Sequence, residues 1–310
     1  MRTLITGSTG LIGTALTASL RADGHEVIRL VRREASGPDE VRWDPGTGLD
    51  EATLGRCGPV DAVVNLAGAG LGDRRWTPAY KREVRASRIN STRTLVSSLT
   101  GWSHPPAVMV SASAIGIYGD TGDRHIDEDS PVGDSFLAQL CRDWEAAASP
   151  AREAGVRVVH PRTGLVLAPR GGAVGRLLPL FRWGLGGVLG SGRQYWSWIS
   201  LLDEVRALRF AIDCAELSGP VNLTGPQPVT NAEFTRALGR VLHRPTFVPA
   251  PAIALRAVIG EFADAVLTGQ RVLPGRLLAA GFEFRHPSVD AALRWVTRAG
   301  QPGDATRTAE

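Results

Sequence analysis

The sequence begins MRTLITGSTGLIG (residues 1–13), in which Gly7, Gly10 and Gly13 recur at every third position. These glycines lie between a short apolar strand pattern and an amphipathic helical pattern. In that context Gly7 permits a tight turn, Gly10 lets a pyrophosphate approach the backbone, and Gly13 lets the helix pack closely on the sheet. The helix N-terminus would then direct its amides and positive dipole end at the phosphates. We therefore expect dinucleotide contacts from the whole loop, Gly7, Ser8, Thr9, Gly10, Leu11, Ile12 and Gly13.

The first half of the chain alternates strand-like and helix-like patterns, which predicts an α/β fold with a Rossmann-type, doubly wound parallel sheet. Strands are expected at 3–6, 26–31, 41–43, 62–66, 107–111 and 156–159, and helices at 11–21, 78–99, 136–153, 231–242 and near 253–267. The pattern changes after Arg162, where glycine, proline and arginine become frequent. We predict a cofactor domain at 1–165 with a returning contribution around 190–205, a smaller C-terminal α/β substrate domain at 166–300, and a disordered tail at 301–310.

Composition narrows the classes of function. A chain of 310 residues with 43% hydrophobic content can bury a sizeable core, and its mild net charge of +4 gives no reason to expect a nucleic-acid partner. Three cysteines stand far apart, and the acidic stretch 120–129 has no metal-ligand spacing, so we expect no metal and interpret that stretch as a solvated loop. Neither a secretory leader nor an apolar run of membrane-spanning length appears, which predicts a cytoplasmic protein without a membrane partner.

The choice between NAD and NADP depends on the residues that follow the second strand. An acidic residue there holds the ribose 2′-hydroxyl of NAD, whereas arginine accommodates the 2′-phosphate of NADP. The strand at 26–31 runs into Arg32 and Arg33. Because the planar guanidinium suits a phosphate, we predict NADP(H). The alternative is that both arginines are solvated loop charges.

Further blocks, taken with the glycine loop, resemble the extended short-chain dehydrogenase/reductase superfamily of nucleotide-sugar epimerases and dehydratases. They are Asn65-Leu66-Ala67-Gly68, Ser111-Ala112-Ser113 with Tyr118-Gly119, Pro161-Arg162-Thr163-Gly164, and Gly190–Gln194 leading to Ile199 and Asp203. More narrowly, the chain resembles the "epimerase family" branch called SDR39U1-like or YfcH-like. The residues that carry this match are Trp43-Asp44-Pro45, Arg75-Trp76, Ser87-Arg88-Ile89, Phe136-Leu137-Ala138, Trp144-Glu145 and the region 245–284.

The resemblance implies an epimerase or oxidoreductase that acts on an unknown small molecule. It adds cofactor contacts from residues beyond the loop, namely Leu66, Ala67, Gly68, Arg88, Ser111 and Arg162. It also implies that Ser113 orients the substrate oxygen, and it leaves Tyr118 either as a proton donor or as packing for its turn. Specificity would come from Arg176, Arg182 and the segment 194–198, and a homodimer is left open.

One feature of the superfamily is missing from the sequence. Its reaction normally uses Tyr-x-x-x-Lys, in which the lysine lowers the pKa of the tyrosine. Lys81 is the only lysine in this chain, and Thr77 stands four residues before it. Alignment on Trp144-Glu145 puts Leu137 and Cys141 where the dyad belongs. The sequence therefore predicts an NADP(H)-binding, dehydrogenase-like protein without the dyad. The alternative is a non-catalytic NADP(H) sensor or regulator, because some relatives carry cell-division names.

Overall fold

A computed structural model describes residues 1–298, so the disorder predicted for 301–310 lies outside the described residues. The chain divides into two compact units. Unit 1 comprises Met1–Ile117, Gly133–Arg162 and Val205–Val221, and unit 2 comprises Tyr118–Val132, Thr163–Glu204 and the chain from Asn222 onward. The domain limits 1–165 and 166–300 stay a prediction.

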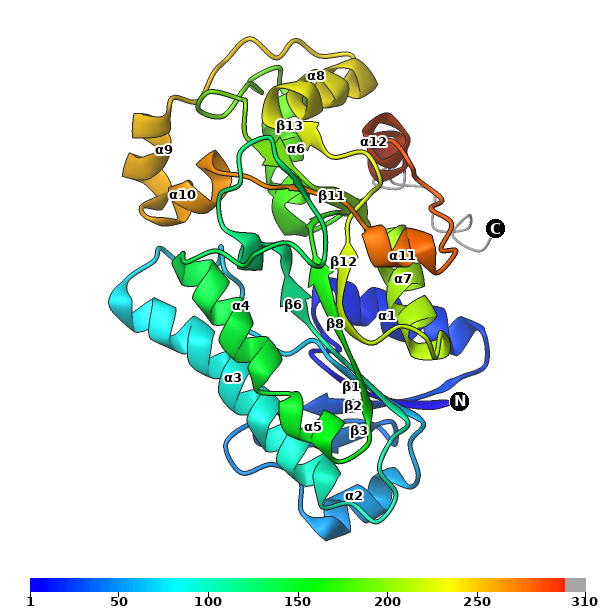
Figure 1. The fold of residues 1–310 in the computed structure, drawn as a ribbon. Coiled ribbons are helices and arrows are strands. Elements are labelled where there is room, and N and C mark those ends of the chain that lie inside the picture. The colour runs from blue at the N-terminus through cyan, green and yellow to red at the C-terminus, as the bar shows by residue number, and fades with distance from the viewer. Residues whose placement is uncertain (299–310) are drawn as a thin grey trace. The chain divides into compact units, whose positions relative to one another are not determined.

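A large sheet forms the centre of unit 1, with the strand order β12-β8-β5-β4-β1-β2-β3 (Figure 1). These strands are β1 (Arg2–Thr6), β2 (Glu26–Val31), β3 (Glu40–Arg42), β4 (Ala62–Asn65), β5 (Val108–Ser111), β8 (Arg157–Thr163) and β12 (Gly219–Leu223). All neighbours from β3 through β8 run parallel, and the short β6 (Ser113–Ala114) pairs with β8. The order reverses between β1 and β4, as in dinucleotide-binding folds. The predicted α/β class with a Rossmann-type parallel sheet is confirmed.

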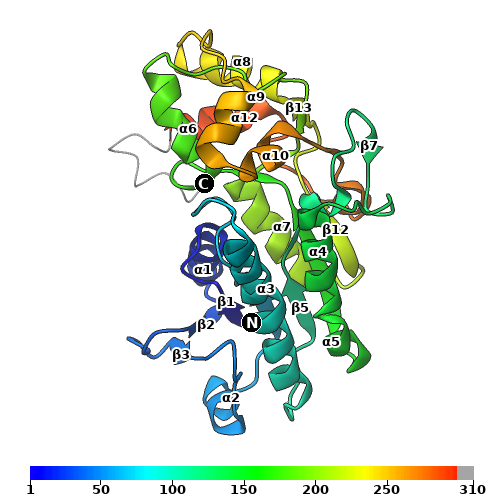
Figure 2. The ribbon, with the colours of Figure 1, turned by 90° about the vertical axis from the view of Figure 1, so that its left-hand side faces the viewer.

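Helices cover both faces of this sheet. On one face lie α2 (Glu51–Cys57), α3 (Pro78–Thr100), α4 (Phe136–Ala146) and α5 (Ser149–Glu153), of which α3, α4 and α5 run side by side in Figure 2. Leu95 and Leu99 of α3 pack with Leu4 and Met109 of the sheet in a buried core. On the other face, Arg209 of α7 (Leu201–Asp213) bonds the hydroxyl of Ser19 on α1 (Leu11–Ala22) at 2.9 Å.

Two predicted elements of unit 1 differ from the structure. The helix expected at 136–153 is two helices, because Pro150 at the start of α5 has no amide to continue the hydrogen bonds of α4. The strand expected to stop at 159 continues as β8 through Pro161 to Thr163. The sheet therefore extends further toward Arg162 than the proline suggested.

Unit 2 consists of helices around short strands. Its strands are β7 (His125–Ile126), β9 (Leu165–Leu167), β10 (Tyr195–Trp196), β11 (Trp198–Ser200), β13 (Val229–Thr230) and β14 (Arg271–Val272). Its helices are α6 (Gly172–Arg182), α8 (Asn231–Leu242), α9 (Ala252–Ile259), α10 (Phe262–Leu267), α11 (Gly275–Ala279) and α12 (Val289–Arg298). In the core of unit 2, Trp198, Phe234 and Leu238 pack with Leu293 and Val296 of α12.

The helix predicted near 253–267 is interrupted, because Gly260 adopts a φ of 64° between α9 and α10. By contrast, α8 begins and ends where predicted. A reciprocal capping box between Thr230 and Glu233 satisfies the amides of its first turn.

Candidate functional site

The glycine loop connects β1 to α1 in a tight turn that excludes side chains at two positions. Gly7 has a φ of 68°, and a Cβ there would lie 2.6 Å from the carbonyl carbon of Leu66. A Cβ on Gly13 would lie 2.2 Å from the Gly7 carbonyl oxygen. At Gly10 the closest atom would be that same oxygen, at 3.3 Å. Gly7 and Gly13 are thus required by packing, whereas Gly10 presents bare backbone.

The first turn of α1 has the features of an anion site. Its N-cap is Gly10, which supplies no side-chain cap to the exposed amides. The hydroxyl of Ser8 is buried and has no hydrogen-bond partner among residues 1–298. An unpaired buried hydroxyl beside uncapped amides fits the pyrophosphate of a dinucleotide, which would accept from both. The loop residues therefore fit such a cofactor.

A buried polar network fixes the neighbouring strand ends. Thr6 Oγ1 donates to Asn65 Oδ1 at 2.7 Å, and Asn65 Nδ2 donates to Thr92 Oγ1 at 2.8 Å. Trp144 Nε1 donates to the same Thr92 hydroxyl at 3.0 Å. These bonds join β1, β4, α3 and α4. They hold the segment after Asn65, which includes Leu66 and Ala67, against the turn at Gly7.

The two arginines after β2 have different surroundings. Arg33 makes a bidentate pair with the buried Glu40, with N–O distances of 2.7 and 2.6 Å. The hydrogen bonds from Arg33 and Ser36 lower the pKa of Glu40 to about 2. Arg32 is exposed, and no carboxylate in residues 1–298 pairs with it. Arg32 therefore offers a guanidinium that the protein leaves uncommitted, whereas Arg33 is already engaged.

A second polar cluster surrounds the predicted substrate serine. Ser113 donates to Glu145 Oε1 at 2.6 Å, and Arg162 grips the same carboxylate through Nε at 2.9 Å and Nη2 at 3.0 Å. Ser113 and Arg162 are buried, and Glu145 is largely covered. Sequence reasoning used Glu145 only as an alignment anchor and missed its contact with Ser113. In the sequence, the adjacent Trp144 was the one indication that this turn of α4 faces the protein interior; its indole Nε1 donates to the Thr92 hydroxyl.

Of the two positions aligned with the Tyr-x-x-x-Lys pair, Cys141 is buried, and Leu137 is partly buried against a hydrophobic cluster. Burial raises the pKa of the Cys141 thiol to about 12, so the thiol stays protonated near neutral pH. Leu137 lies against Gly116: a Cβ added at Gly116 would be 3.3 Å from the Cβ of Leu137. Neither side chain can donate or accept a proton in the way that a tyrosine–lysine pair does.

Arg88 is a covered cation on α3. Its guanidinium lies 5.2 Å from the centre of the Trp144 ring, and a Cβ on Gly68 would be 3.0 Å from its Cζ. Burial lowers its pKa, and no carboxylate in the described chain pairs with it. Ser111 is the last residue of β5, and its hydroxyl is 3.4 Å from Asn65 Nδ2. A cation in this setting suits an anionic group of a bound cofactor.

Tyr118, the predicted alternative proton donor, is only 2% exposed and donates its hydroxyl to Asn222 Oδ1 at 2.7 Å. The backbone amide of Asn222 donates to Glu128 at 2.9 Å. Glu128 is buried and also accepts from the Arg276 amide, so the interpretation of 120–129 as a uniformly solvated loop was wrong for this residue. The contacts of Tyr118 favour the packing role over the proton donor.

Residues predicted to give specificity have structural contacts. Gln194 donates to the carbonyls of Leu189 and Val266, and the ring centres of Trp196 and the core residue Phe234 lie 4.9 Å apart with the planes tilted by 58°. On α3, Lys81 lies over the rings of Trp76 and Phe136, and Arg85 pairs with Asp143 at 2.5 Å. The part of the segment 194–198 in substrate binding stays a prediction, as does that of Arg176 and Arg182. Among residues 1–298, no three histidine, cysteine or carboxylate side chains gather as a metal site, and no helix is long and apolar enough to cross a bilayer.

Comparison with protein families matches residues 3–223 to the NAD dependent epimerase/dehydratase family. The chain belongs to this epimerase family. Residues 250–296 also match a domain of unknown function, DUF1731. An epimerase family protein of Mycobacterium bovis is 53% identical over 94% of this chain and 96% of its own length. The epimerase family protein SDR39U1 of Bos taurus is 42% identical, over 96% and 99%.

Solved structures agree with the epimerase family assignment. The crystal structure of human epimerase family protein SDR39U1 (isoform 2) with NADPH has a TM-score of 0.87 and 38% identity, and covers 96% of this chain and 99% of that chain. A nucleoside-diphosphate sugar epimerase from Corynebacterium glutamicum has a TM-score of 0.79 and 37% identity, and covers 98% and 59%. The predicted SDR39U1-like assignment is confirmed, and with it an NAD(P)-binding protein of the epimerase family.

Proposed function

We propose that this chain binds NADP(H) and uses it as an epimerase or oxidoreductase on a small molecule. The observation that carries the proposal is the match along nearly the whole chain to a relative crystallised with NADPH, combined with a glycine loop that fits a dinucleotide. The uncommitted Arg32 after β2 supports NADP(H) over NAD(H). We also propose a cytoplasmic location, since Cys57, Cys141 and Cys214 are free thiols.

The cofactor contacts divide by chemistry. The pyrophosphate would accept hydrogen bonds from the uncapped amides in the first turn of α1 and from the Ser8 hydroxyl. Arg32 would bind the 2′-phosphate, with Arg33 beside it held by Glu40. The remaining contacts would come from the ends of β4, β5 and β8 and from α3, through Leu66, Ala67, Gly68, Ser111, Arg162 and Arg88.

Ser113 is the residue that we propose to orient the substrate. A bound nicotinamide would supply or accept the hydride. Because Ser113 gives its own proton to Glu145, its lone pairs are left to accept a hydrogen bond from a substrate hydroxyl. Arg162 fixes the Glu145 carboxylate through two bonds, so the serine hydroxyl has one preferred direction. Glu145 and Arg162 are thus positioning residues. The Tyr118 hydroxyl already donates to Asn222, so we rank Tyr118 below Ser113 as a residue that contacts the substrate.

A second function has a specific observation in its favour. The sequence contains no Tyr-x-x-x-Lys pair, and of the aligned residues Cys141 is buried and Leu137 is partly buried. A protein that keeps the cofactor loop without the proton-transfer pair would suit an NADP(H) sensor or regulator.

Two measurements test the proposal and separate these functions. In a fluorescence titration, we expect NADPH to bind at least about tenfold more tightly than NADH, since a charged contact is worth about 1.5–3 kcal/mol. NADH binding as tight as NADPH would overturn the cofactor preference. Turnover is then followed as loss of NADPH absorbance against a panel of aldehydes, ketones and keto sugars. Consumption that Ser113→Ala abolishes supports the enzyme, whereas tight binding without consumption supports the sensor.

A further inference from the structure

Unit 2 exposes large apolar side chains at the end of α6 and on the segment that follows α8. Trp183 is 83% exposed and Phe247 is 86% exposed, and Leu180, Leu185 and Val248 are about half exposed. Single exposed apolar residues are ordinary, but an apolar area that spans neighbouring segments marks a surface that contacts something else.

Backbone contacts show that these residues come from segments lying side by side. Arg244 Nε donates to the Arg182 carbonyl at 2.9 Å, and the Val248 amide donates to Gly186 at 3.3 Å. Further along, the Ala250 amide donates to the Val188 carbonyl at 2.9 Å. The segments 182–188 and 244–250 therefore lie side by side, and each carries exposed apolar side chains.

Helix α9 extends this stretch directly after Pro251. Its sequence AIALRAVI carries a single polar residue, yet none of its residues is buried. Ile253 is 81% exposed and Val258 is 75% exposed. A surface helix normally turns its apolar side inward, so α9 has an apolar side that the described protein does not cover. We call the exposed residues on these segments the apolar face: Leu180, Trp183, Leu185, Phe247, Val248, Ile253 and Val258.

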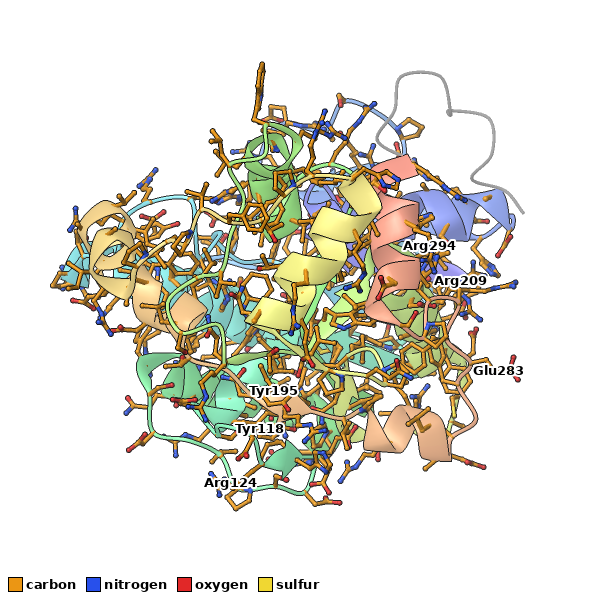
Figure 3. The ribbon with its side chains drawn as sticks, turned by 90° about the horizontal axis from the view of Figure 1, so that it is seen from above. Tyr118, Arg124, Tyr195, Arg209, Glu283 and Arg294 are labelled. Carbon is orange, nitrogen blue, oxygen red and sulfur yellow. The ribbon has the colours of Figure 1, made fainter. Side chains whose placement is uncertain are left out.

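A basic cavity adjoins the apolar face. It has a volume of about 650 Å³ and is lined by the C-terminal parts of α6, α8 and α12, with Arg182, Arg240, Arg294 and Arg298 around it. Figure 3 shows Arg294 on α12, beside α8. Arg182 lines the cavity and directly precedes the exposed Trp183 in the chain. We call these four arginines the arginine basin.

The charges in the basin are not balanced within the described chain. Asp290 is the one carboxylate lining it, and it pairs with Arg240 at 2.9 Å. No carboxylate in residues 1–298 pairs with Arg182 or Arg294. Helices α6 and α8 end here, but each C-terminus carries only about half a negative charge, which leaves a net positive basin.

We propose that the apolar face and the arginine basin dock unit 2 on the surface of an anionic lipid bilayer. The arginines would contact headgroup phosphates, and the apolar side chains would enter the boundary between headgroups and acyl chains. Five of the seven residues of the face are aliphatic, which suits acyl chains better than the stacked bases of a nucleic acid. The sequence led us to expect no membrane partner because no apolar run could span a bilayer, but surface docking requires no span.

Vesicle flotation tests this proposal with the full chain. The probes are phosphatidylcholine vesicles and vesicles in which about a quarter of the lipid is phosphatidylglycerol, at low and high salt. We expect flotation with the anionic vesicles only, weakened by salt. Two double variants should each weaken vesicle binding at least about tenfold. One is Trp183→Ser with Phe247→Ser, and the other is Arg182→Glu with Arg294→Glu. The matched controls are Leu278→Ser, an exposed leucine on α11, and Arg142→Glu on α4, which should bind like the unchanged protein.

Other outcomes would overturn the proposal. No flotation, equal flotation with neutral vesicles, or flotation unaffected by either double variant each contradicts it. If the protein does not bind vesicles but forms a dimer, and the double variant Trp183→Ser with Phe247→Ser dissociates that dimer, the apolar face binds a second copy of this chain. Binding of single-stranded RNA that the arginine variants abolish, again without flotation, would assign it to nucleic acid. Thermal unfolding verifies that the variants fold, and NADPH titration reports on the proposed function separately.

Discussion

Arg32 and Arg33 are adjacent in the sequence, yet only Arg33 has a partner in the protein. Because Glu40 engages Arg33, the exposed Arg32 is the better ligand for a 2′-phosphate. Arg32→Ala should weaken NADPH binding about 10- to 100-fold and leave NADH binding unchanged, since only NADPH carries that phosphate. Paired titrations of the two cofactors measure this. Equal losses for both cofactors would place Arg32 elsewhere.

Arg33→Ala is the matched variant for that experiment. It removes the bidentate partner of the buried Glu40 and should lower the stability of the fold, which urea denaturation would show. Its NADPH affinity should fall less than that of Arg32→Ala. The reverse order would make Arg33 the phosphate ligand.

Glu204 at the start of α7 is a buried acid whose charge depends on pH. Thr163 donates to its Oε1 at 2.8 Å, while Oε2 has no partner among residues 1–298. Burial raises the pKa of Glu204 to about 8, well above its value in an unfolded chain. Between those two pKa values the native state holds a proton that the unfolded state has released. Stability from this group is therefore present at low pH and is lost as pH rises toward 8.

Glu204→Gln removes that titration. The free energy of unfolding of the variant, relative to the unchanged protein, should increase by on the order of 3 kcal/mol between about pH 5 and about pH 9. Urea denaturation across this range gives the difference. Parallel stability curves would mean that Glu204 does not titrate abnormally.

Among the elements, the turn between β1 and α1 tolerates substitution least. Gly13→Ala would place a Cβ 2.2 Å from the Gly7 carbonyl oxygen, so the turn must shift. We expect this variant to lose at least about tenfold in NADPH affinity and about 1–3 kcal/mol in stability.

The control for Gly13→Ala is Gly55→Ala in α2. A Cβ at Gly55 meets nothing within 4 Å, so alanine should stabilise that helix by about 0.5–1 kcal/mol and leave NADPH binding unchanged. If both variants bind NADPH normally, the close approach at Gly13 is not needed for the cofactor.

Local signals predicted some elements well and others poorly. The helix at 231–242 was predicted in full, because its capping box and apolar spacing both lie within the segment. The break between α4 and α5 was missed although Pro150 was visible, because the apolar spacing continued across it. Helix α12 was not predicted, even though Val289, Ala292, Leu293 and Val296 follow helical spacing.

Contacts between distant segments account for what the sequence did not predict at the site. The glycine loop was visible because strand, turn and helix are consecutive. The bonds that join Ser113, Glu145 and Arg162 were not, because they need three elements of the sheet and helix layers to meet. The ion pair between Arg33 and Glu40, which Arg32 lacks, likewise depends on the pairing of β2 with β3.

For the whole molecule, cofactor binding should appear as stability. A ligand at about 100 times its Kd that binds only the native state adds about 2.7 kcal/mol. NADPH should therefore raise the unfolding temperature in calorimetry, and NADH at the same concentration should raise it less. Gly13→Ala should abolish the shift. A shift that survives this variant would mean that NADPH binds outside the glycine loop.

The near absence of lysine also determines which reagents can modify this protein. Lys81, which lies over Trp76 and Phe136, is the one lysine of the sequence, and it belongs to unit 1. All three cysteines belong to unit 1 as well, so unit 2 contains neither an amine nor a thiol. Amine-directed acylation or cross-linking would therefore leave unit 2 untouched. A single cysteine introduced there would be its one reactive position, and a fluorophore on it would report on unit 2 alone.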